Sequence, residues 1–417
     1  MRILIVNKFL YPNGGSETYI FELGKELERQ GHAVEYFGME HEGRIVGNHA
    51  ESYTSPMDFH GSGISRLLYP FRILYSREAR KKIRKVLEDF NPDIVHLNNF
   101  NFQITPSVIY EIRKFEKQKG KKIPIVYTAH DYQWVCPNHM LFLPEQDKLC
   151  FACKGGKFGN CAANRCIHGS RIKSILGMLE AKLYQRLKTY GKVDLIICPS
   201  AFMRDILATN PLLSGKLQVF HNFLTAGEKK YQDKKDYVLY FGRYAREKGM
   251  DTLLSVCRQL PEIPFVFAGG GEYEEEIAKL SNIQNVGFQR GEALIELIGS
   301  ARFSVFPSEW YENCPFSVME SQYYGTPVIA SNMGGVPELL EDGETGELFT
   351  AGDQEELKGK IRELWNNREK LDAYTKKCRE KRFQEAPEYA EQLVKEFRRL
   401  LESHEHKETT AKDHDPE

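Results

Sequence analysis

The sequence predicts an α/β protein built from two doubly wound domains. Its 417 residues exceed what one ordinary hydrophobic core supports, which indicates two domains. Short runs of Val, Ile and Leu alternate with segments of helical spacing, as in parallel sheets covered by helices on both faces. This alternation restarts after the polar, lysine-rich segment "AGEKKYQDKKD" at residues 226–236.

The first half of the chain opens on the strand "RILIVN". The helical segment "GSETYIFELGKELERQG" follows, with Tyr19, Leu23 and Leu27 on one side and Gly31 at its end. Residues 201–209 are predicted as a short helix. The remaining predicted strands of this half are "AVEYFG", "DIVHLNN", "IPIVYTAHD", "VDLIICPS" and "LQVFHN".

The second half repeats the pattern. Residues 248–260 are predicted as a helix, and the predicted strands are "YVLYFGR", "PFVFAGGG", "ARFSVFPS" and "PVIAS". We therefore expect a first domain at 1–222, a linker at 223–236 and a second domain at 237–385. We expect a helix at 386–402 that packs back on the first domain. The tail 403–417 has almost no apolar content and is predicted to be disordered.

Charge is divided unevenly between the two halves. Residues 1–200 contain 29 Lys and Arg against 20 Asp and Glu, whereas residues 201–417 contain 28 against 38. The basic half is the one expected to face an anionic surface. No run approaches the roughly 20 apolar residues that span a bilayer. The start is too short in apolar residues for a signal peptide, so we expect a cytoplasmic protein.

Two loops carry residues suited to a phosphate group. Gly14 and Gly15 lie between the first strand and the first helix, where backbone N–H groups and the helix dipole favour an anion. In "FGRYAREKG", Arg243 and Lys248 lie in one strand-to-helix loop and could converge on a diphosphate. A plain tight turn and a solvated charged loop are the alternatives.

The stretch "PSEWYENCPFSVMESQYYGTPVIAS", residues 307–331, places carboxylates on both sides of a helix start. Pro315 opens the helical run and Gly325 closes it. The peptide N–H groups near 314–317 are then unpaired donors at the base of a cleft between the domains. We expect Glu320, inside the helix, to accept hydrogen bonds from a diol such as a ribose, and Glu312, on the loop, to hold sugar hydroxyls.

These residues resemble a known family. Glu312, seven intervening residues and Glu320, within "PSEWYENCPFSVMESQYYGTPVIASNMGGVPELLEDGETGELF", resemble the signature of the retaining family-4 glycosyltransferases, the glycosyl transferases group 1. "NGGSE", "YTAHD" and "FGRYAREKG" occur in the expected order. The resemblance covers about residues 1–400. It implies the GT-B fold, in which two Rossmann-like domains face a central cleft.

The resemblance also implies roles for individual residues. Arg243 and Lys248 would neutralise the diphosphate leaving group, and Glu320 would bind the ribose. Glu312 would bind the donor sugar, and His130 would contact the donor sugar or its phosphate, although His130 could also be a structural histidine. The expected catalytic residues are His130, Arg243, Lys248 and Glu312. The expected donor-binding residues are Gly14, Gly15, Arg243, Lys248, Cys314, Pro315, Phe316 and Glu320.

The implied reaction transfers a glycosyl group from a nucleotide-diphosphate sugar to an acceptor hydroxyl with retention at the anomeric carbon. The resemblance implies no catalytic metal, since cationic side chains and helix N-termini replace it. The expected context is cell-surface polysaccharide or glycolipid synthesis, with a sugar, glycan or lipid-linked acceptor and no nucleic acid. A sugar-nucleotide epimerase of the same architecture is the alternative. A non-catalytic scaffold is disfavoured by the intact set Arg243, Lys248, Glu312 and Glu320.

Five of the nine cysteines crowd into the segment 136–168 of the first domain. Their spacing, with C-x2-C at 150–153, is typical of a zinc knuckle in a segment with little apolar content. A reducing compartment favours zinc over disulfides. We expect a structural zinc on Cys136, Cys150, Cys153 and Cys166, with Cys161 spare. Free thiols and an iron–sulfur site remain alternatives.

Two basic amphipathic segments, 64–87 and 170–192, could lie on an anionic membrane surface. The first holds eight Lys and Arg residues and one Glu. The alternative is that both are solvated helices covering the first sheet. The membrane interpretation would place the protein on the inner face of the membrane as a peripheral protein.

Overall fold

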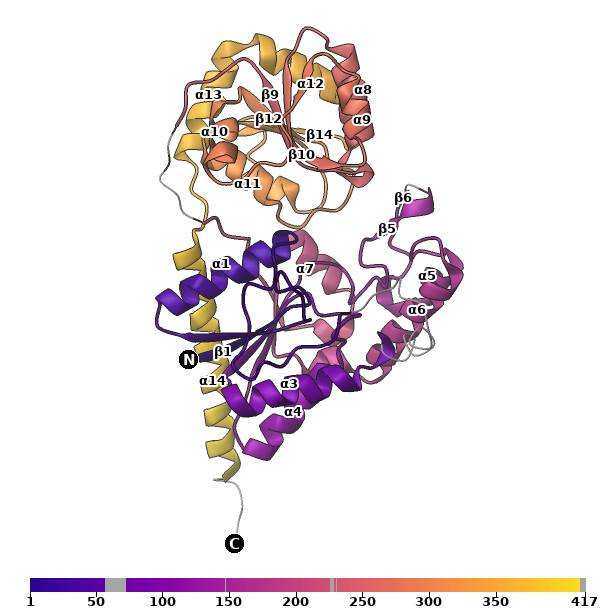
Figure 1. The fold of residues 1–417 in the computed structure, drawn as a ribbon, viewed down its shortest axis with the longest axis vertical. Coiled ribbons are helices and arrows are strands. Elements are labelled where there is room, and N and C mark those ends of the chain that lie inside the picture. Colours follow the sequence, from indigo (N-terminus) through magenta and orange to yellow (C-terminus); the bar gives the residue numbers. More distant parts are fainter. Residues whose placement is uncertain (57–72, 147, 226–228, 230, 413–417) are drawn as a thin grey trace. The chain divides into compact units, whose positions relative to one another are not determined.

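The computed structural model describes residues 1–56, 73–146, 148–225, 229 and 231–412. The chain divides into two compact units. Unit 1 comprises residues 1–199, 203–220 and 386–417, and unit 2 comprises residues 200–202 and 221–385. Each unit holds one six-stranded parallel sheet with helices on it (Figure 1). The predicted α/β architecture of two doubly wound domains is confirmed.

The sheet of unit 1 has the strand order β2-β1-β3-β4-β7-β8. Its central strands β1, β3, β4 and β7 are nearly continuous apolar runs that are almost entirely buried, as expected for a sheet covered on both faces. All neighbours pair in parallel. The strands are β1 (Arg2–Val6), β2 (Ala33–Phe37), β3 (Ile94–Leu97), β4 (Ile125–Thr128), β7 (Leu195–Cys198) and β8 (Leu217–Val219).

The helices of unit 1 present apolar sides to this sheet or to one another. In α1 the predicted stripe of Tyr19, Leu23 and Leu27 is fully buried, at 1% exposure or less. α3 packs against α4, and α1 packs against the C-terminal helix α14. The helices are α1 (Gly15–Arg29), α3 (Arg77–Phe90), α4 (Ser107–Lys119), α5 (Gly159–Ala163), α6 (Arg171–Arg186), α7 (Ala201–Leu207) and α14 (Ala386–Lys412).

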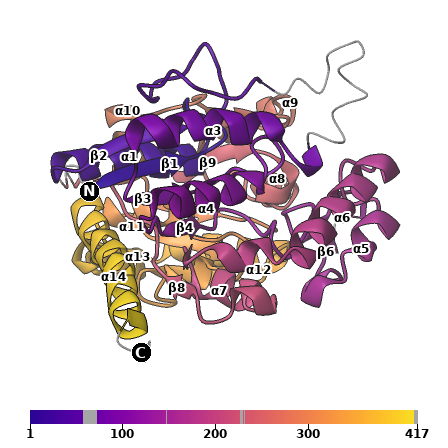
Figure 2. The same ribbon diagram turned by 90° about the horizontal axis from the view of Figure 1, so that it is seen from below.

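The cysteine-rich segment folds into a lobe beside the sheet of unit 1 (Figures 1 and 2). It consists of the two-stranded sheet β5 (Phe142–Leu143) and β6 (Lys148–Leu149), followed by α5 and α6. α5 packs against α6. The small core of this lobe is rich in cysteines, with Leu143, Phe158 and Ala181 as its buried apolar members.

The sheet of unit 2 has the order β11-β10-β9-β12-β13-β14 and is also parallel throughout. Buried side chains alternate between two hydrophobic clusters, one on each face of the sheet. The strands are β9 (Val238–Tyr244), β10 (Phe265–Gly271), β11 (Ile283–Asn285), β12 (Phe303–Phe306), β13 (Val328–Ser331) and β14 (Gly346–Phe349). The helices are α8 (Met250–Gln259), α9 (Glu274–Ala278), α10 (Glu292–Ser300), α11 (Phe316–Tyr323), α12 (Gln354–Asn366) and α13 (Arg368–Glu380).

The segments before and after the second domain, the predicted linker at 223–236 and the residues from 386 on, differ in detail from the sequence-based prediction. Lys234, from the predicted linker, is bound to unit 2, where its Nζ donates to the Gly299 carbonyl (3.0 Å) and to Thr326 Oγ1 (2.6 Å). The helix predicted at 386–402 belongs to unit 1 and continues as α14 to Lys412. Residues 403–412, predicted to be disordered, are therefore helical in backbone, because Glu, Lys and Ala readily extend an existing helix. Residues 413–417 lie outside the described part of the chain.

Candidate active site

The site residues predicted in unit 2 lie where its strand order reverses. From β9 the chain proceeds to β10 on one side, whereas β12 pairs with β9 on the other side. In a parallel sheet such a reversal leaves a crevice outside the carboxyl ends of the two strands, where ligands bind. Arg243 lies near the carboxyl end of β9 and Lys248 follows that strand, and Glu312 follows β12. The topology thus brings both predicted loops to one edge of the sheet.

Lys248 and Glu312 form an ion pair at this edge. The Lys248 Nζ donates to Glu312 Oε1 at 2.5 Å, and the Ser308 hydroxyl donates to the same oxygen at 2.9 Å. The side chains of Lys248 and Glu312 are 22% and 13% exposed. The Lys248 ammonium also lies 5.5 Å from the centre of the Trp310 ring. Lys248 and Ser308 therefore both hold the Oε1 atom of Glu312, and these two hydrogen bonds do not involve its Oε2 atom.

Arg243 is also paired, with a residue of its own loop. Its guanidinium donates to Glu247, four residues on, while its side chain remains 59% exposed. The loop is short because Gly249 takes a positive φ of +74°, and a Cβ there would lie 1.9 Å from the Pro307 carbonyl oxygen. This close approach holds the loop after β9 against the loop after β12. The segment that carries both predicted cations therefore lies against the loop that carries Glu312.

Glu320 lies in a different environment from Glu312. Among the described residues, no hydrogen-bond partner is recorded for its carboxylate, and burial raises the pKa of Glu320 to about 7. It lies on α11, whose N-cap is Pro315 and whose first N–H groups receive no side-chain cap. Unpaired N–H groups at a helix start attract an anion, and a carboxyl inside the helix can accept from hydroxyl groups. This arrangement fits a phosphate and a diol held by one helix.

Cys314 and the glycine pair Gly334–Gly335 fix the conformation of the loop between β12 and α11. The Asn222 backbone N–H donates to Cys314 Sγ (3.2 Å) and its Nδ2 to the Cys314 carbonyl (2.9 Å). The Gly335 N–H donates to the Glu312 carbonyl at 2.7 Å. A Cβ at Gly334 would lie 2.2 Å from that same carbonyl oxygen, so only glycine permits this contact. Cys314 is thus a structural part of the loop.

In unit 1, His130 follows β4 and lies beside the carboxyl end of β3. Its Nε2 hydrogen-bonds to Asn98 Oδ1 at 3.0 Å, and Asn98 follows β3. Because Asn98 Oδ1 is an acceptor, His130 Nε2 carries the proton. Burial lowers the pKa of His130 to about 3, so the ring is neutral at physiological pH. It can therefore donate or accept a hydrogen bond, and it brings no charge to a phosphate.

Gly14 and Gly15 lie at the start of α1, next to the strand reversal of unit 1 between β1 and β3. The carboxylate of Glu17, which is buried, occupies the first turn of α1. It accepts from Asn7 Nδ2 and from Ser16 Oγ, each at 2.9 Å. An anion already present at this N-terminus competes with a phosphate for the helix dipole. The Gly-Gly loop is therefore a weaker phosphate site than the start of α11.

The predicted site residues fall into two sets. The structure brings Arg243, Lys248, Glu312, Cys314, Pro315, Phe316 and Glu320 to one edge of unit 2, and places Gly14, Gly15 and His130 in unit 1. The sequence analysis did not single out the residues that hold these groups, namely Asn98, Glu247, Ser308, Gly334 and Gly335. The spacing of Arg243 and Glu247, four residues apart, was a local signal that could have indicated their pairing.

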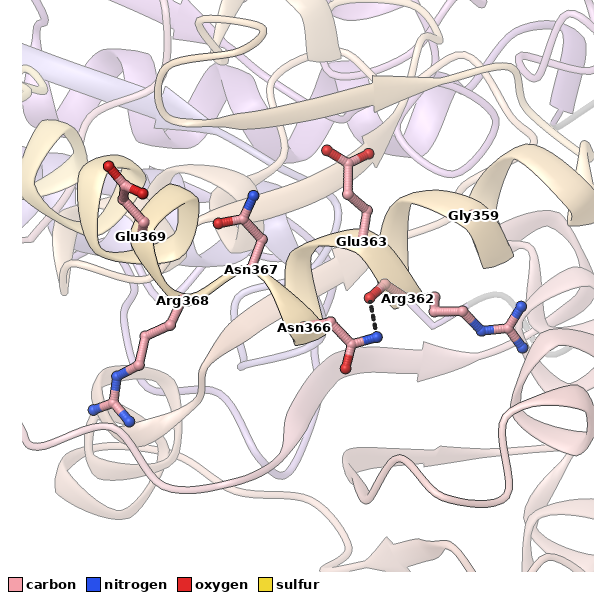
Figure 3. A pocket seen from close by; sticks show the side chains of 7 residues that line it. All are labelled: Gly359, Arg362, Glu363, Asn366, Asn367, Arg368 and Glu369. Carbon is pink, nitrogen blue, oxygen red and sulfur yellow. Dashed lines mark hydrogen bonds between the residues drawn. The ribbon is translucent and has the colours of Figure 1, made fainter.

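A surface depression of about 680 Å³ lies elsewhere, at the junction of α12 and α13. Arg302, which directly precedes β12, donates to the Trp365 carbonyl at 2.9 Å, so this junction lies at the edge where strands begin. Figure 3 shows its charged side chains pointing in different directions, with one hydrogen bond from Asn366 to the Arg362 carbonyl. Nothing in this arrangement converges on a ligand.

A group of three or more His, Cys, Asp or Glu side chains that could hold a metal ion as they stand is not found in the described ranges. The residues at this edge of unit 2 that suit a nucleotide sugar are the two cations, the start of α11 and the two carboxylates. Two parallel-sheet units, with an anion site and a diol acceptor at the reversal point of one of them, define a nucleotide-binding α/β enzyme.

The chain belongs to glycosyltransferase family 4. The model of Glycosyltransferase Family 4 matches residues 13–226, and that of Glycosyl transferases group 1 matches residues 225–381. The family predicted from the sequence is thus confirmed. The comparisons do not support the alternative of a sugar-nucleotide epimerase.

Related proteins are similar to this chain over part or most of its length. The sulfoquinovosyl transferase SQD2 of Arabidopsis thaliana is 29% identical over 45% of this chain and 41% of its own length. An uncharacterised 42.6 kDa protein in the cps region of Klebsiella pneumoniae is 24% identical over 81% of this chain and 87% of its own length.

Solved structures of similar fold cover nearly the whole chain. The sucrose-phosphate synthase of Thermosynechococcus elongatus has a TM-score of 0.71 at 17% identity, covering 96% of this chain and 99% of its own. Anabaena HepE in complex with UDP-glucose has a TM-score of 0.63 at 16% identity, covering 97% and 100%. These likenesses establish the GT-B fold.

Proposed function

We propose that the protein transfers a sugar from a nucleotide-diphosphate sugar to an acceptor hydroxyl with retention at the anomeric carbon. The partly buried carboxylate of Glu320, on the uncapped helix α11, carries this proposal. Its surroundings raise the pKa of Glu320 to about 7, which marks a position suited to a ligand, and its place inside α11 suits a ribose diol. That Anabaena HepE was solved with UDP-glucose supports this class of donor.

The remaining residues of unit 2 act on the diphosphate and the sugar. Arg243 and Lys248 would stabilise the negative charge that develops on the leaving diphosphate. The backbone N–H groups at the start of α11, directly after Pro315, would contribute to the same stabilisation. When donor binds, the diphosphate competes with Glu312 for Lys248 and with Glu247 for Arg243. Whether or not Glu312 keeps its contact with Lys248, its carboxylate then accepts hydrogen bonds from the sugar hydroxyls. In this proposal no residue acts as a covalent nucleophile, and no catalytic metal is required.

In unit 1, His130 would serve the donor sugar as a neutral hydrogen-bonding group. Its Nε2–H is directed to Asn98, which leaves Nδ1 as its acceptor side. Gly14 and Gly15 would leave room for the diphosphate beside α1. The acceptor would be a sugar, glycan or lipid-linked hydroxyl in polysaccharide or glycolipid synthesis.

We further propose that α6 rests on an anionic membrane. Its apolar stripe at helical spacing faces solvent, with Ile172, Leu179 and the C-capping Leu187 at 73%, 43% and 46% exposure. Exposed cations flank the stripe: Arg171, Lys173, Lys182, Arg186 and Lys188. The acid of α6, Glu180, is buried, which raises its pKa to about 8 and keeps it uncharged. This charge pattern is complementary to acidic lipid headgroups.

The second predicted membrane segment is less suited to this role. Residues 64–72 lie outside the described part of the chain. Further along, α3 buries its apolar residues against unit 1, including Ile83, Leu87 and Phe90. No helix among those described in the structure is both long enough and apolar enough to pass through a bilayer. The proposed contact is therefore peripheral and carried by α6.

The experiment that tests the transferase proposal supplies a panel of nucleotide-diphosphate sugars, with and without candidate acceptors. We expect nucleotide release to depend on acceptor, and the product anomer, read by NMR, to match the donor. Arg243→Ala should lower kcat about 100- to 1,000-fold, by analogy with lost transition-state donors. The neighbouring Arg246→Ala is the matched control. Donor turnover that ignores acceptor, or an inverted product, would contradict the proposal.

A further inference from the structure

A chain of buried hydrogen-bonding side chains crosses unit 1 beside His130, and no step of the proposed reaction uses it. The Tyr389 hydroxyl on α14 lies 2.8 Å from the Tyr19 hydroxyl on α1. The Tyr19 hydroxyl also lies 3.2 Å from Thr128 Oγ1, at the end of β4. Thr128 Oγ1 in turn lies 2.8 Å from His96 Nε2 in β3. The chain therefore connects the last helix of the protein to its first helix and to two strands of the sheet.

All four members of this chain are removed from water. Tyr19, His96, Thr128 and Tyr389 are each 1% exposed or less. Burial raises the pKa of Tyr19 to about 12 and lowers the pKa of His96 to about 3, so both groups are neutral. A buried polar group that loses its hydrogen-bond partner is costly. Removing one hydroxyl from the chain therefore favours a shift of the side chain that was bonded to it.

The ring of Tyr19 connects this chain to His130. The centres of the two rings lie 5.2 Å apart and their planes meet at 68°, which is an edge-to-face contact. At its tip, the Tyr19 side chain is held by the hydrogen bonds to Tyr389 and Thr128. Loss of either bond would let the Tyr19 ring turn, and the His130 ring would lose a fixed neighbour.

The ring of His130 is also held by the end of β3. Its Nε2 donates to Asn98 Oδ1 at 3.0 Å, and Asn98 Nδ2 donates to the His96 carbonyl at 3.3 Å. The bond to Asn98 sets the tautomer of His130, and the contact with Tyr19 limits the tilt of its ring. His96 belongs to both supports, through its carbonyl on one side and its imidazole on the other.

We propose that Tyr19 and Tyr389 are positioning residues for His130, so that the last helix of the chain helps to orient the site of the donor sugar. This inference rests on the role proposed for His130 in binding that sugar. A hydrogen bond depends on the direction of its donor and acceptor, and a displacement of about 1 Å can cost roughly 100-fold in rate. Tyr389 acts through Tyr19, and Tyr19 acts through His130.

NMR of the histidine rings in the free protein tests the positioning without any substrate. Tyr389→Phe and Tyr19→Phe each remove one hydroxyl and keep the buried ring. The His130 signal, identified by its absence in His130→Gln, is sensitive to the orientation of the neighbouring Tyr19 ring. We expect this signal to shift or broaden in both variants.

The matched control is Tyr184→Phe. Tyr184 is another fully buried tyrosine of unit 1, and its hydroxyl donates to the Leu74 carbonyl at 2.7 Å. This variant loses a buried hydrogen bond outside the chain, so the His130 signal should stay unchanged. A His130 signal in Tyr389→Phe that is identical to that of the wild type would overturn the proposal.

Thr128 separates hydrogen bonding from packing. Thr128→Val keeps the shape of the side chain and removes its hydroxyl, whereas Thr128→Ser keeps the hydroxyl and removes a methyl group. If the chain acts through hydrogen bonds, Thr128→Val should displace the His130 signal and Thr128→Ser should not. Displacement by Thr128→Ser with a normal signal in Thr128→Val would show that packing alone holds His130, and would contradict the proposal.

Kinetics distinguishes this inference from the proposed function. With the donor that the nucleotide-sugar panel selects, we expect Tyr389→Phe to lower kcat about tenfold and to change the donor KM at most about twofold. Combined with His130→Gln, it should cause no further loss, because the hydroxyl acts through His130. A normal kcat in Tyr389→Phe, or additive losses in the double variant, would overturn the positioning role. A normal kcat in His130→Gln would instead overturn the role proposed for His130.

Discussion

Two glutamates eight residues apart show how the surroundings of a side chain decide its chemistry. The Glu312 carboxylate accepts hydrogen bonds from Lys248 and Ser308, whereas partly buried Glu320 has no hydrogen-bond partner for its carboxylate among the described residues. Removal from water favours the neutral form of a carboxyl group and raises the pKa of Glu320. The same residue type therefore has fixed partners at one position and is a proton-dependent acceptor at the other.

Glu320→Gln should make the stability of the free protein less sensitive to pH. Burial raises the folded-state pKa of Glu320 from 4.5 to about 7. The folded protein then binds a proton more tightly than the unfolded chain, so stability falls as pH rises from about 4.5 to 7. We expect Glu320→Gln to be more stable than wild type at pH 8, by at most about 3 kcal/mol, with a smaller difference at pH 5. Urea unfolding at both pH values measures this.

The matched control is Glu292→Gln, an exposed glutamate on α10. It should leave the pH dependence of stability unchanged. In calorimetry with a nucleoside diphosphate, Glu320→Gln should weaken binding at pH 8, because a ribose diol loses an anionic acceptor. A variant that gains stability equally at both pH values, and binds nucleotide normally, would contradict both the pKa assignment and the ribose role.

The ion pair between Lys248 and Glu312 should appear as strong coupling in a double-mutant cycle. Lys248→Met and Glu312→Gln each leave a half-buried partner without its counter-charge, and each removes a donor contact. We expect each to lower kcat at least tenfold, and the double variant to lose less than the sum of the two in free energy. Steady-state kinetics with a fixed donor measures the coupling. Simple additivity would show that the two residues act independently.

At the scale of secondary structure, the sequence pattern predicted most strands, missed the short edge strands, and did not identify several helices, among them α4, α12 and α13. Strands such as β1 and β12 are continuous apolar runs, which have an unambiguous signal. β11 ("IQN") and β14 ("GELF") were not predicted, because three or four residues of mixed polarity carry almost no periodicity. Both are edge strands, where one neighbour suffices.

The site was predicted less completely than the fold, for a physical reason. Loops after β9 and β12 could be located from their composition, since strands, glycines and charges are local features. The pairing of Lys248 with Glu312, 64 residues apart, depends on which strands are neighbours, and no sequence spacing encodes that. The contacts of Asn98 with His130 and of Gly334 with the Glu312 loop are missing from the prediction for the same reason.

The exposed stripe on α6 leads to a prediction about lipid binding. Lys173→Glu combined with Lys182→Glu should reduce co-sedimentation with vesicles rich in phosphatidylglycerol at least tenfold, because each cation near an anionic surface contributes about 1 kcal/mol. Ile172→Ser should weaken binding without altering its dependence on salt. Uncharged phosphatidylcholine vesicles are the control.

A protein that binds neither vesicle type, or binds both equally well, would contradict the α6 proposal. The matched control is the double variant Lys376→Glu and Lys377→Glu on α13. It changes the net charge of the protein by the same amount, but outside unit 1. This variant should leave vesicle binding unchanged, which separates a local effect of α6 from an effect of overall charge.

At the scale of the whole molecule, the last helix of the chain completes the first unit. The apolar side of α14 is buried, with Tyr389, Leu393 and Phe397 at 0% exposure. The Tyr389 hydroxyl also lies 2.8 Å from the Tyr19 hydroxyl of α1, and Gln30 donates to the Pro387 carbonyl at 3.1 Å. The core of unit 1 is therefore assembled from the two ends of the sequence.

Truncation after Glu385 should consequently unfold unit 1. Three fully buried large side chains contribute about 5–9 kcal/mol of burial free energy, which is comparable to the stability of a whole domain. We expect the truncated protein to lose one of two calorimetric transitions, or to accumulate insoluble. Truncation after Leu401 keeps these side chains and is the matched control, with both transitions retained. Two undisturbed transitions in the shorter chain would show that α14 is dispensable.

The position of α14 in the chain also bears on the order of events during synthesis. Unit 2 is nearly contiguous in sequence, so it can fold as soon as residue 385 has left the ribosome. Unit 1 emerges first and has all its strands, yet it waits for the final helix while more than 160 further residues are translated. During that interval the face that α14 will cover is apolar and open to solvent. Nascent chains of this protein should therefore depend on chaperones that shield such a face, and emergence of α14, rather than emergence of the sheet, should mark the moment at which unit 1 becomes native.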